Sequence, residues 1–243
     1  MPPVMQAEPS RASTSSSRIR IPRAELLDGL RSAARQPMRD ALEATLAQLQ
    51  ACARSGRGLL NDVLGRQQAF AEWQHYPRND AVDPQSGYRF YYHAHAAAQR
   101  ARDEHGHFHV FAPRAALAPG QPAHAHLFAL SVNAQGWPTR VFTTNRWVTA
   151  EHWEDARWSL RALRGLDLSR ARPRRVAGWV QNMACLFAPQ IQEVIRQRDL
   201  RIAQRAQRQA LQQVLEDRRT HIVSQCQVDL ARQFRFLQDA GVA

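Results

Sequence analysis

Apolar residues recur at three- and four-residue spacing in the first quarter of the chain, which is the period of an α-helix. One series begins at Pro22 and a second at Pro37, because proline is tolerated in the first turn of a helix. The glycines Gly56 and Gly58 end the second series. A shorter helix is expected from Leu59 to about Trp73.

The pattern changes to two-residue alternation in the middle of the chain, which indicates β-strands. The stretch HYPRNDAVDPQSG (75–87) is rich in proline, aspartate and glycine and is interpreted as a loop. Four strand-like runs follow: GYRFYYHAH (87–95), HGHFHVFA (105–112), HLFALSV (126–132) and TRVFTT (139–144). The turn NAQG predicts a hairpin between the last two. Because no helix of useful length separates the runs, an antiparallel meander of about four strands is predicted.

Helical spacing returns after Trp147 and continues towards the C-terminus. Helices are predicted from Thr149 to Gly165, over 173–187 and from Pro189 to about Leu215, and Asp229 is expected to cap a last helix. HIVSQCQV (221–228) has a mixed pattern and is interpreted as a short strand or a loop. Helices, sheet and helices in this order are typical of the α+β class, with a small antiparallel sheet packed on helices.

The length of 243 residues is sufficient for one hydrophobic core. Hydrophobic residues make up 44% and charged residues 22%, as in an ordinary soluble globular protein. No apolar run approaches the ~20 residues that a membrane span needs, and the N-terminus lacks the apolar segment of a secretory signal. We expect a disordered tail over 1–20 and a single α+β domain over 21–243, in which 21–75 and 149–240 are helical and 87–145 form the sheet.

Charge and cysteine content limit the partners and the compartment. The net charge of +12 comes from arginine alone, densest in 157–175 and 196–208. This charge allows an anionic partner, but both segments fall on helical patterns, where solvated faces usually carry charge, so nucleic acid is not favoured. Cys52, Cys185 and Cys226 lie far apart without a Cys-x-x-Cys pair, which favours a reducing, cytoplasmic location.

Eight of the ten histidines lie between His75 and His126. Residues two apart on a strand point to the same face, so alternation assigns each side chain to a face. The face opposite the apolar positions is predicted to carry Tyr91, His93, His95, His105, His107 and His109. By the same rule His124 and His126 share parity with the apolar Phe128, so they are assigned to the core side, near the start of their strand.

This histidine face is a candidate metal site. Strands lie about 4.8 Å apart and same-face residues about 6.8 Å apart, so imidazoles of two strands can converge on one ion. Neutral imidazole binds zinc, iron, copper and nickel, and a catalytic site usually has three protein ligands and one open position. The preferred ligands for a divalent metal (zinc, iron or manganese) are any three of His93, His95, His107 and His109. The alternative is a hydrogen-bonded polar surface or an anion site.

Other residues near this face are assigned supporting roles. Glu104 is a candidate carboxylate ligand or general base, and His107 is a candidate catalytic residue. Tyr91 and His105 are candidates for contacts with a ligand.

The segment NRWVTAEHW (145–153) joins the last predicted strand to a helix. Asn145 and Arg146 lie where the sheet ends, which is a frequent position for binding groups. Arg146 could pair with a carboxylate or a phosphate in a forked geometry. The structural interpretation, which we favour, is a capped helix with Trp147 and Trp153 packed in the core.

Two motifs resemble enzyme families in part. GYRFYYHAH resembles the first half of the cupin metal motif, but the expected glutamate and the second motif are missing. HGHFHVF resembles the histidine triad of nucleotide hydrolases and transferases. That resemblance implies that His107 attacks the α-phosphate of a nucleotide. Gly106 departs from the triad, and the usual upstream nucleotide-binding segments are not recognisable.

A wider resemblance covers most of the chain after His75. The strings HYP, YYHAH, EHGHFHVF, NRWVTAEHW, LFAPQI and EDR together resemble an uncharacterised bacterial domain family of unknown function. That resemblance implies no activity. Three functions are therefore open: a metal-binding domain, with metal-dependent hydrolysis or oxidation as its chemistry; a non-catalytic domain that binds an anionic ligand or nucleic acid; and a histidine-triad nucleotide enzyme.

Overall fold

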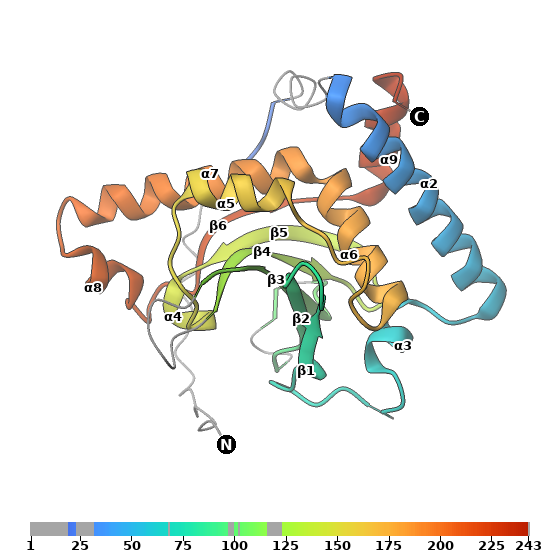
Figure 1. Ribbon diagram of the computed structural model, residues 1–243, viewed down its shortest axis with the longest axis horizontal. Coiled ribbons are helices and arrows are strands. Elements are labelled where there is room, and N and C mark those ends of the chain that lie inside the picture. Colours follow the sequence, from blue (N-terminus) through green and yellow to red (C-terminus); the bar gives the residue numbers. More distant parts are fainter. Residues whose placement is uncertain are drawn as a thin grey trace.

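The computed structural model describes residues 19–22, 32–67, 69–96, 100–101, 103–115 and 123–242. Within these residues the chain forms one antiparallel sheet and eight helices (Figure 1). The strands, in sheet order, are β1 (Tyr76–Val82), β2 (Arg89–His93), β3 (Gly106–Pro113), β4 (His124–Val132), β5 (Pro138–Thr144) and β6 (Ile222–Gln227). The helices are α2 (Ser32–Ser55), α3 (Leu59–Leu64), α4 (Arg146–Thr149), α5 (Ala156–Arg164), α6 (Arg174–Leu186), α7 (Ala188–Ala206), α8 (Leu211–Leu215) and α9 (Leu230–Asp239).

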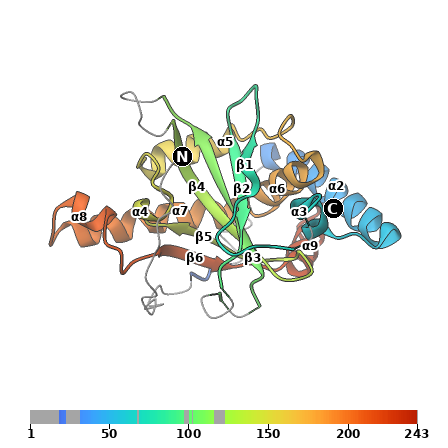
Figure 2. The ribbon, with the colours of Figure 1, turned by 90° about the horizontal axis from the view of Figure 1, so that it is seen from below.

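The longer helices of the C-terminal half cover one face of the sheet. Figure 1 shows α5, α6 and α7 lying across this face, with α2 packed on α6 and α8 beyond the end of α7. Figure 2 looks at the sheet from below, onto the face turned away from these helices. In the described part of the chain, no helix combines the length and the apolar composition needed to cross a bilayer.

The helix-facing side of the sheet is the hydrophobic core. Phe90, Phe108, Val110, Phe128 and Leu130 have no exposed surface, and they belong to one cluster with apolar residues of α6 and α7. Complete burial of such a side chain contributes about 1.5–3 kcal/mol. These residues therefore fix which side of each strand faces the helices, and the alternate residues point to the opposite side.

The pairing of β2 with β3 brings residues of the same parity together on the opposite side. His93 pairs with His107 and Tyr91 pairs with His109. Directly opposed residues of an antiparallel pair have Cβ atoms about 4.5–5.5 Å apart. The two alternating histidine runs therefore form neighbouring rows of side chains.

The α+β class is as predicted, but the predicted number of about four strands is wrong, because the sheet has six. β1 lies in the stretch interpreted as a loop. It is an edge strand whose pairing with β2 is irregular between Tyr76 and Ala81, where Pro77 and the positive φ of Asp80 interrupt the alternation. Proline is tolerated at such an edge. β6, for which the sequence allows a strand or a loop, pairs with β5 from Ile222 to Gln227, with one register shift between Thr143 and Thr144.

Several helix boundaries also differ from the predictions. α2 runs through Pro37 instead of beginning there. α4 ends at Thr149, Ala150 adopts a left-handed conformation, and α5 begins only after its cap Asp155. The helix predicted from Pro189 to Leu215 is divided into α7 and α8. Most of the predicted tail over 1–20, and most of the helix predicted after Pro22, lie outside the described residues.

Candidate metal centre

Three histidines from the adjacent ends of β2 and β3 converge. The Nε2 atoms of His93 and His107 lie 2.8 Å apart. His95 follows the end of β2, and one ring nitrogen of each of the three histidines lies within 4.8 Å of the others. His93 and His107 are buried, whereas His95 is partly exposed. The three residues, called here the histidine trio, offer ligand atoms at a spacing that one ion can bridge.

Glu104 fixes the orientation of His107. Its Oε1 lies 2.9 Å from Nδ1 of His107, and its Oε2 accepts hydrogen bonds from Ser131 Oγ at 2.7 Å and Arg140 Nη2 at 2.5 Å. A carboxylate only accepts hydrogen bonds, so Nδ1 of His107 carries the proton. In the neutral imidazole the lone pair is then on Nε2, which is directed at His93. This is the carboxylate–histidine arrangement that commonly orients a metal ligand.

The carboxylate of Glu104 stays ionised in this setting. Burial alone would raise its pKa, but the hydrogen bond from His107, the charge of Arg140 and the hydroxyl of Ser131 outweigh burial and lower the pKa to about 2. Arg140 is itself buried, and its Nη1 donates to Gln225 Oε1 at 3.0 Å. The support for His107 therefore comes from β4, β5 and β6.

Burial keeps the other two histidines of the trio neutral. It lowers the pKa of His93 well below its ordinary value, and repulsion between protons on His93 and on the neighbouring imidazoles His107 and His95 acts in the same direction. It lowers the pKa of His95 to about 4. Neutral imidazole is the form that binds a metal, so both residues are in the metal-binding form at neutral pH.

A second pair of buried histidines adjoins the trio. Nδ1 of His109 lies 3.1 Å from Nε2 of His126, and the ring centroids of His107 and His109 are 4.8 Å apart. The assignment of His126 to the core side is wrong, because the register of β4 against β3 shifts between Phe128 and His126. This β-bulge adds one residue and reverses the parity, which no pattern in the sequence indicates.

The family of the chain follows from a comparison of its sequence with known domains. The sequence profile of a domain of unknown function (DUF6969) matches residues 39–228. The chain belongs to this family. No curated protein and no solved structure matches it. The DUF6969 match confirms the expected membership of an uncharacterised domain family and assigns no activity.

Two further candidate residues of the DUF6969 domain lie on opposite sides of the sheet. Tyr91 is on the histidine side, with its ring stacked on His75 at 3.7 Å and 5.0 Å from the ring of His109. Burial raises the pKa of Tyr91 above its ordinary value, so its hydroxyl stays protonated. His105 instead lies against the core residue Tyr92, with its Nδ1 2.6 Å from the Tyr92 hydroxyl.

Asn145 and Arg146 hold elements of the DUF6969 domain together. The Asn145 side chain caps α4 by accepting from the backbone N–H of Arg146, and its Nδ2 donates to the carbonyl of Val214 at 2.9 Å. Arg146 forms an ion pair with Glu216. Trp147 donates its ring N–H to the carbonyl of Thr220 at 3.0 Å. These contacts favour a capped helix with a structural role, but Trp147 and Trp153 are half-buried and do not lie in the core as expected.

The sequence pattern does not reveal all the residues that hold Glu104 in place behind His107. Arg140, Ser131 and Gln225 were not selected, although they hold Glu104 directly or through Arg140. Alternation could have indicated Arg140, because it shares a face of β5 with the buried Phe142. Its pairing with Glu104 joins residues 36 positions apart, which the sequence pattern does not reveal.

We expect the protein to lose stability as the pH falls from about 6.5 to about 4.5. Unfolded histidines titrate near pH 6.5, whereas burial lowers the pKa of His95 to about 4 and that of His126 to about 3. Burial also holds the pKa of His93 and His109 well below the ordinary value. In this window the unfolded chain binds more protons than the folded chain, so stability is full above pH 6.5 and decreases below it.

One buried carboxyl opposes this trend. Burial raises the pKa of Glu151 to about 7, so its contribution grows as the pH falls. Each pKa unit corresponds to about 1.4 kcal/mol of stability. The lowered pKa values of four histidines therefore outweigh the raised pKa of one carboxyl group. Thermal unfolding followed by circular dichroism in the presence of a chelator measures the net effect. A melting temperature that stays constant or rises over this range would contradict the account.

Proposed function

We propose that this protein binds one divalent metal ion through His93, His95 and His107. The observation that carries the proposal is the close approach of the Nε2 atoms of His93 and His107, at 2.8 Å, with Nδ1 of His107 held by Glu104. A hydrogen-bonded pair of histidines would explain the close approach alone. Such a pair would not explain why a third imidazole lies at the same point, or why a buried ion pair lies behind His107.

The spacing fits an ion after small rotations of the rings. With metal–nitrogen bonds of about 2.0–2.1 Å in tetrahedral geometry, ligand nitrogens lie about 3.3 Å apart. The nitrogens of the trio lie between 2.8 Å and 4.8 Å apart, so the closest pair has to separate slightly and His95 has to approach. Neutral side chains impose little electrostatic resistance to this movement.

The donor set supports zinc or iron more than manganese. Three imidazoles suit zinc, iron, copper and nickel, whereas manganese favours carboxylate oxygens. The carboxylate of Glu104 already accepts from His107, Ser131 and Arg140, which supports a positioning role for it rather than a role as ligand or base. Its low pKa points in the same direction, since a general base works best near the operating pH.

Metal-activated water is the chemistry that this arrangement supports best. Three histidines leave the fourth position of a tetrahedral zinc site open, and a zinc-bound water loses a proton near neutral pH. Solvent has access at His95, which is partly exposed and packs against the exposed Trp73 at a ring distance of 4.3 Å. The proposed function is therefore metal-dependent hydrolysis. Iron-dependent oxidation has less support, because such sites often use two histidines and one carboxylate.

The nucleotide-transfer alternative has less support from the geometry. In the histidine triad all three histidines act at one site, whereas His105 lies against Phe70 and Tyr92. The cytoplasmic location stays a prediction that rests on the cysteine pattern.

Titration of metal-free protein with cobalt(II) tests the proposal. We expect one equivalent to bind, with the visible absorption of a tetrahedral cobalt site, and zinc to displace it. Zinc-loaded protein is expected to hydrolyse an activated ester faster than metal-free protein. Failure to bind cobalt or zinc at one equivalent would contradict the metal centre, and binding without hydrolysis would contradict the proposed chemistry.

A Glu104→Gln variant tests the positioning role of that residue. The amide can no longer provide a charged acceptor for Nδ1 of His107, so we expect the affinity for zinc to fall by about 10- to 100-fold. Glu216→Gln removes the same charge from the ion pair with Arg146 and serves as the matched control. Equal zinc affinities of the two variants, measured by competition with a chromogenic chelator, would show that Glu104 does not act on the metal ligand.

A further inference from the structure

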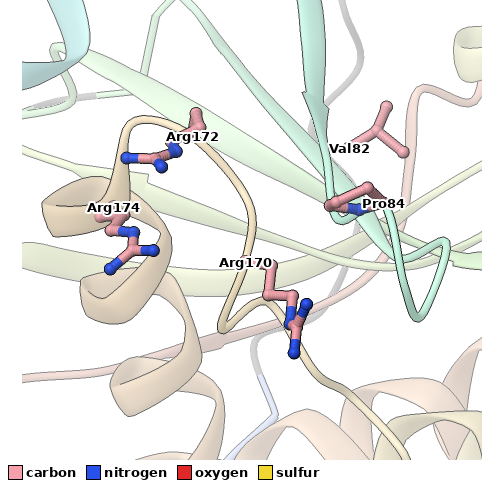
Figure 3. Close-up of a pocket in the computed structure, with 5 residues that line it drawn as sticks. All are labelled: Val82, Pro84, Arg170, Arg172 and Arg174. Atoms are coloured by element: carbon pink, nitrogen blue, oxygen red, sulfur yellow. The ribbon is translucent and has the colours of Figure 1, made fainter.

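Three arginines lie at the start of α6 and on the loop that leads into it. Arg170, Arg172 and Arg174 line a cavity of about 440 Å³ together with Val82 and Pro84, which lie at the turn between β1 and β2 (Figure 3). The three arginines are exposed. Residues 170–175 contain four arginines and no acidic residue. The cavity therefore has a concentrated positive charge and a small apolar wall.

No carboxylate pairs directly with these three guanidinium groups. Within the part of the chain that the structure describes, the guanidinium groups of Arg170, Arg172 and Arg174 form no ion pair. The next residue, Arg175, differs because it pairs with Asp62 at 3.1 Å. Asp83 lies in the turn, but its carboxylate accepts from the backbone N–H groups of Gln85, Ser86 and Arg170. The oxygens of Asp83 thus accept hydrogen bonds from the backbone and not from the guanidinium groups.

Hydrogen bonds hold the two walls of the cavity in place. Oδ2 of Asp83 accepts from the backbone N–H of Arg170 at 2.7 Å. Ser86 Oγ donates to the carbonyl of Asp167 at 2.6 Å, and the Tyr88 hydroxyl donates to the carbonyl of Ala162 at 2.7 Å. The turn and the loop are therefore joined before any ligand arrives. A preformed site loses less entropy on binding than a flexible one.

We propose that this cavity binds a small molecule with adjacent negative charges, of the diphosphate class. Each guanidinium offers paired N–H donors that match phosphate oxygens, and three guanidinium groups require more than one negative charge. Val82 and Pro84 provide apolar contact for the rest of such a molecule. The volume lies within the range of about 300–1000 Å³ that is usual for ligand sites.

This site is separate from the histidine trio. The turn precedes the first residue of β2, Arg89, whereas His93 is the last residue of β2. Four residues of a strand span about 13 Å. The anion site thus adds a binding function that does not depend on the metal proposal.

Calorimetric titration with inorganic pyrophosphate tests the site. The full chain is compared with a triple variant in which Arg170, Arg172 and Arg174 are replaced by glutamine. A matched control replaces the exposed Arg208, Arg232 and Arg235, which removes the same charge from the region of α7 and α9. We expect the pocket variant to bind pyrophosphate about 100-fold more weakly and the control to bind it like the original chain.

Two further binding measurements identify the class of ligand. Binding is expected to persist in a His93→Ala, His107→Ala variant and to be weaker with inorganic phosphate than with pyrophosphate. The proposal is overturned if the original chain does not bind pyrophosphate, or if the control loses as much affinity as the pocket variant. It is also overturned if a single-stranded oligonucleotide binds more tightly than pyrophosphate through the same arginines, because the site would then be a nucleic-acid surface.

Discussion

Replacing His93 and His107 together by alanine is expected to abolish the binding of cobalt(II) and zinc. The two residues provide two of the three proposed ligands and the closest pair of nitrogen atoms. A structural zinc site contributes about 10–16 kcal/mol of binding free energy, which its ligands share. With His95 alone, the ion would retain one protein ligand and exchange freely with solvent.

The matched control for this variant replaces His105 and His221 by alanine. Both residues lie outside the histidine trio: His105 contacts the Tyr92 hydroxyl and His221 packs on Trp147. We expect this control to bind one equivalent of metal with unchanged affinity. The shift of the melting temperature on addition of zinc provides an independent readout, because a ligand that binds only the folded state raises it. A zinc-induced shift of equal size in both variants would contradict the assignment.

Gly106→Ala is expected to be the most destabilising single substitution near the site. A Cβ atom at this position would lie 2.4 Å from the Tyr92 hydroxyl and 2.5 Å from the carbonyl oxygen of His93. The carbonyl belongs to the neighbouring strand, and the hydroxyl is held by His105 at 2.6 Å. Neither atom can give way without moving the backbone of β2 or β3. We expect a loss of about 3 kcal/mol or more in the free energy of unfolding.

The change at Gly106 should also weaken the metal site. Any separation of β2 from β3 moves His93 away from His107, because these residues are paired across the two strands. Gly178→Ala is the matched control, since a Cβ there meets nothing within 4 Å and lies inside α6. The control is expected to gain up to about 1 kcal/mol. Urea unfolding measures both changes, and equal stability of the two variants would contradict the close approach at Gly106.

Local alternation predicted the face on which these side chains lie, because the two-residue period of a strand leaves little freedom. Tyr91 and His93 on β2, and His107 and His109 on β3, lie on the side opposite the core. The α+β class followed from the same pattern. The sequence also indicated the helix cap at Asp229, where the carboxylate accepts from the backbone N–H of Arg232.

Features that depend on irregular backbone or distant contacts were not predictable. β1 was missed because Pro77 and the positive φ of Asp80 remove the alternation from an edge strand. His126 was assigned to the wrong side because one extra residue in β4 reverses the parity. Arg140 reaches Glu104 from two strands away in the sheet order, and only the tertiary fold brings them together.

The sequence shows where arginines are dense, but not whether they lie on a helix surface or on the wall of a cavity. The segment 157–175 falls on helical patterns, which predict solvated faces that carry charge. The structure places Arg161 and Arg164 on α5, whereas Arg170 and Arg172 lie on a loop that is attached to the turn after β1. Charge density alone cannot distinguish a helix surface from a cavity wall, since the difference lies in what packs beside it.

The most direct test of the metal centre is a crystal structure of the protein grown with zinc, with anomalous data collected at the zinc edge. The account predicts one strong peak between β2 and β3, about 2.0–2.1 Å from a nitrogen of each of His93, His95 and His107. The Nε2 atoms of His93 and His107 should have separated from 2.8 Å to about 3.3 Å. A structure in which these two atoms remain in direct contact, with zinc bound elsewhere or not at all, would contradict it.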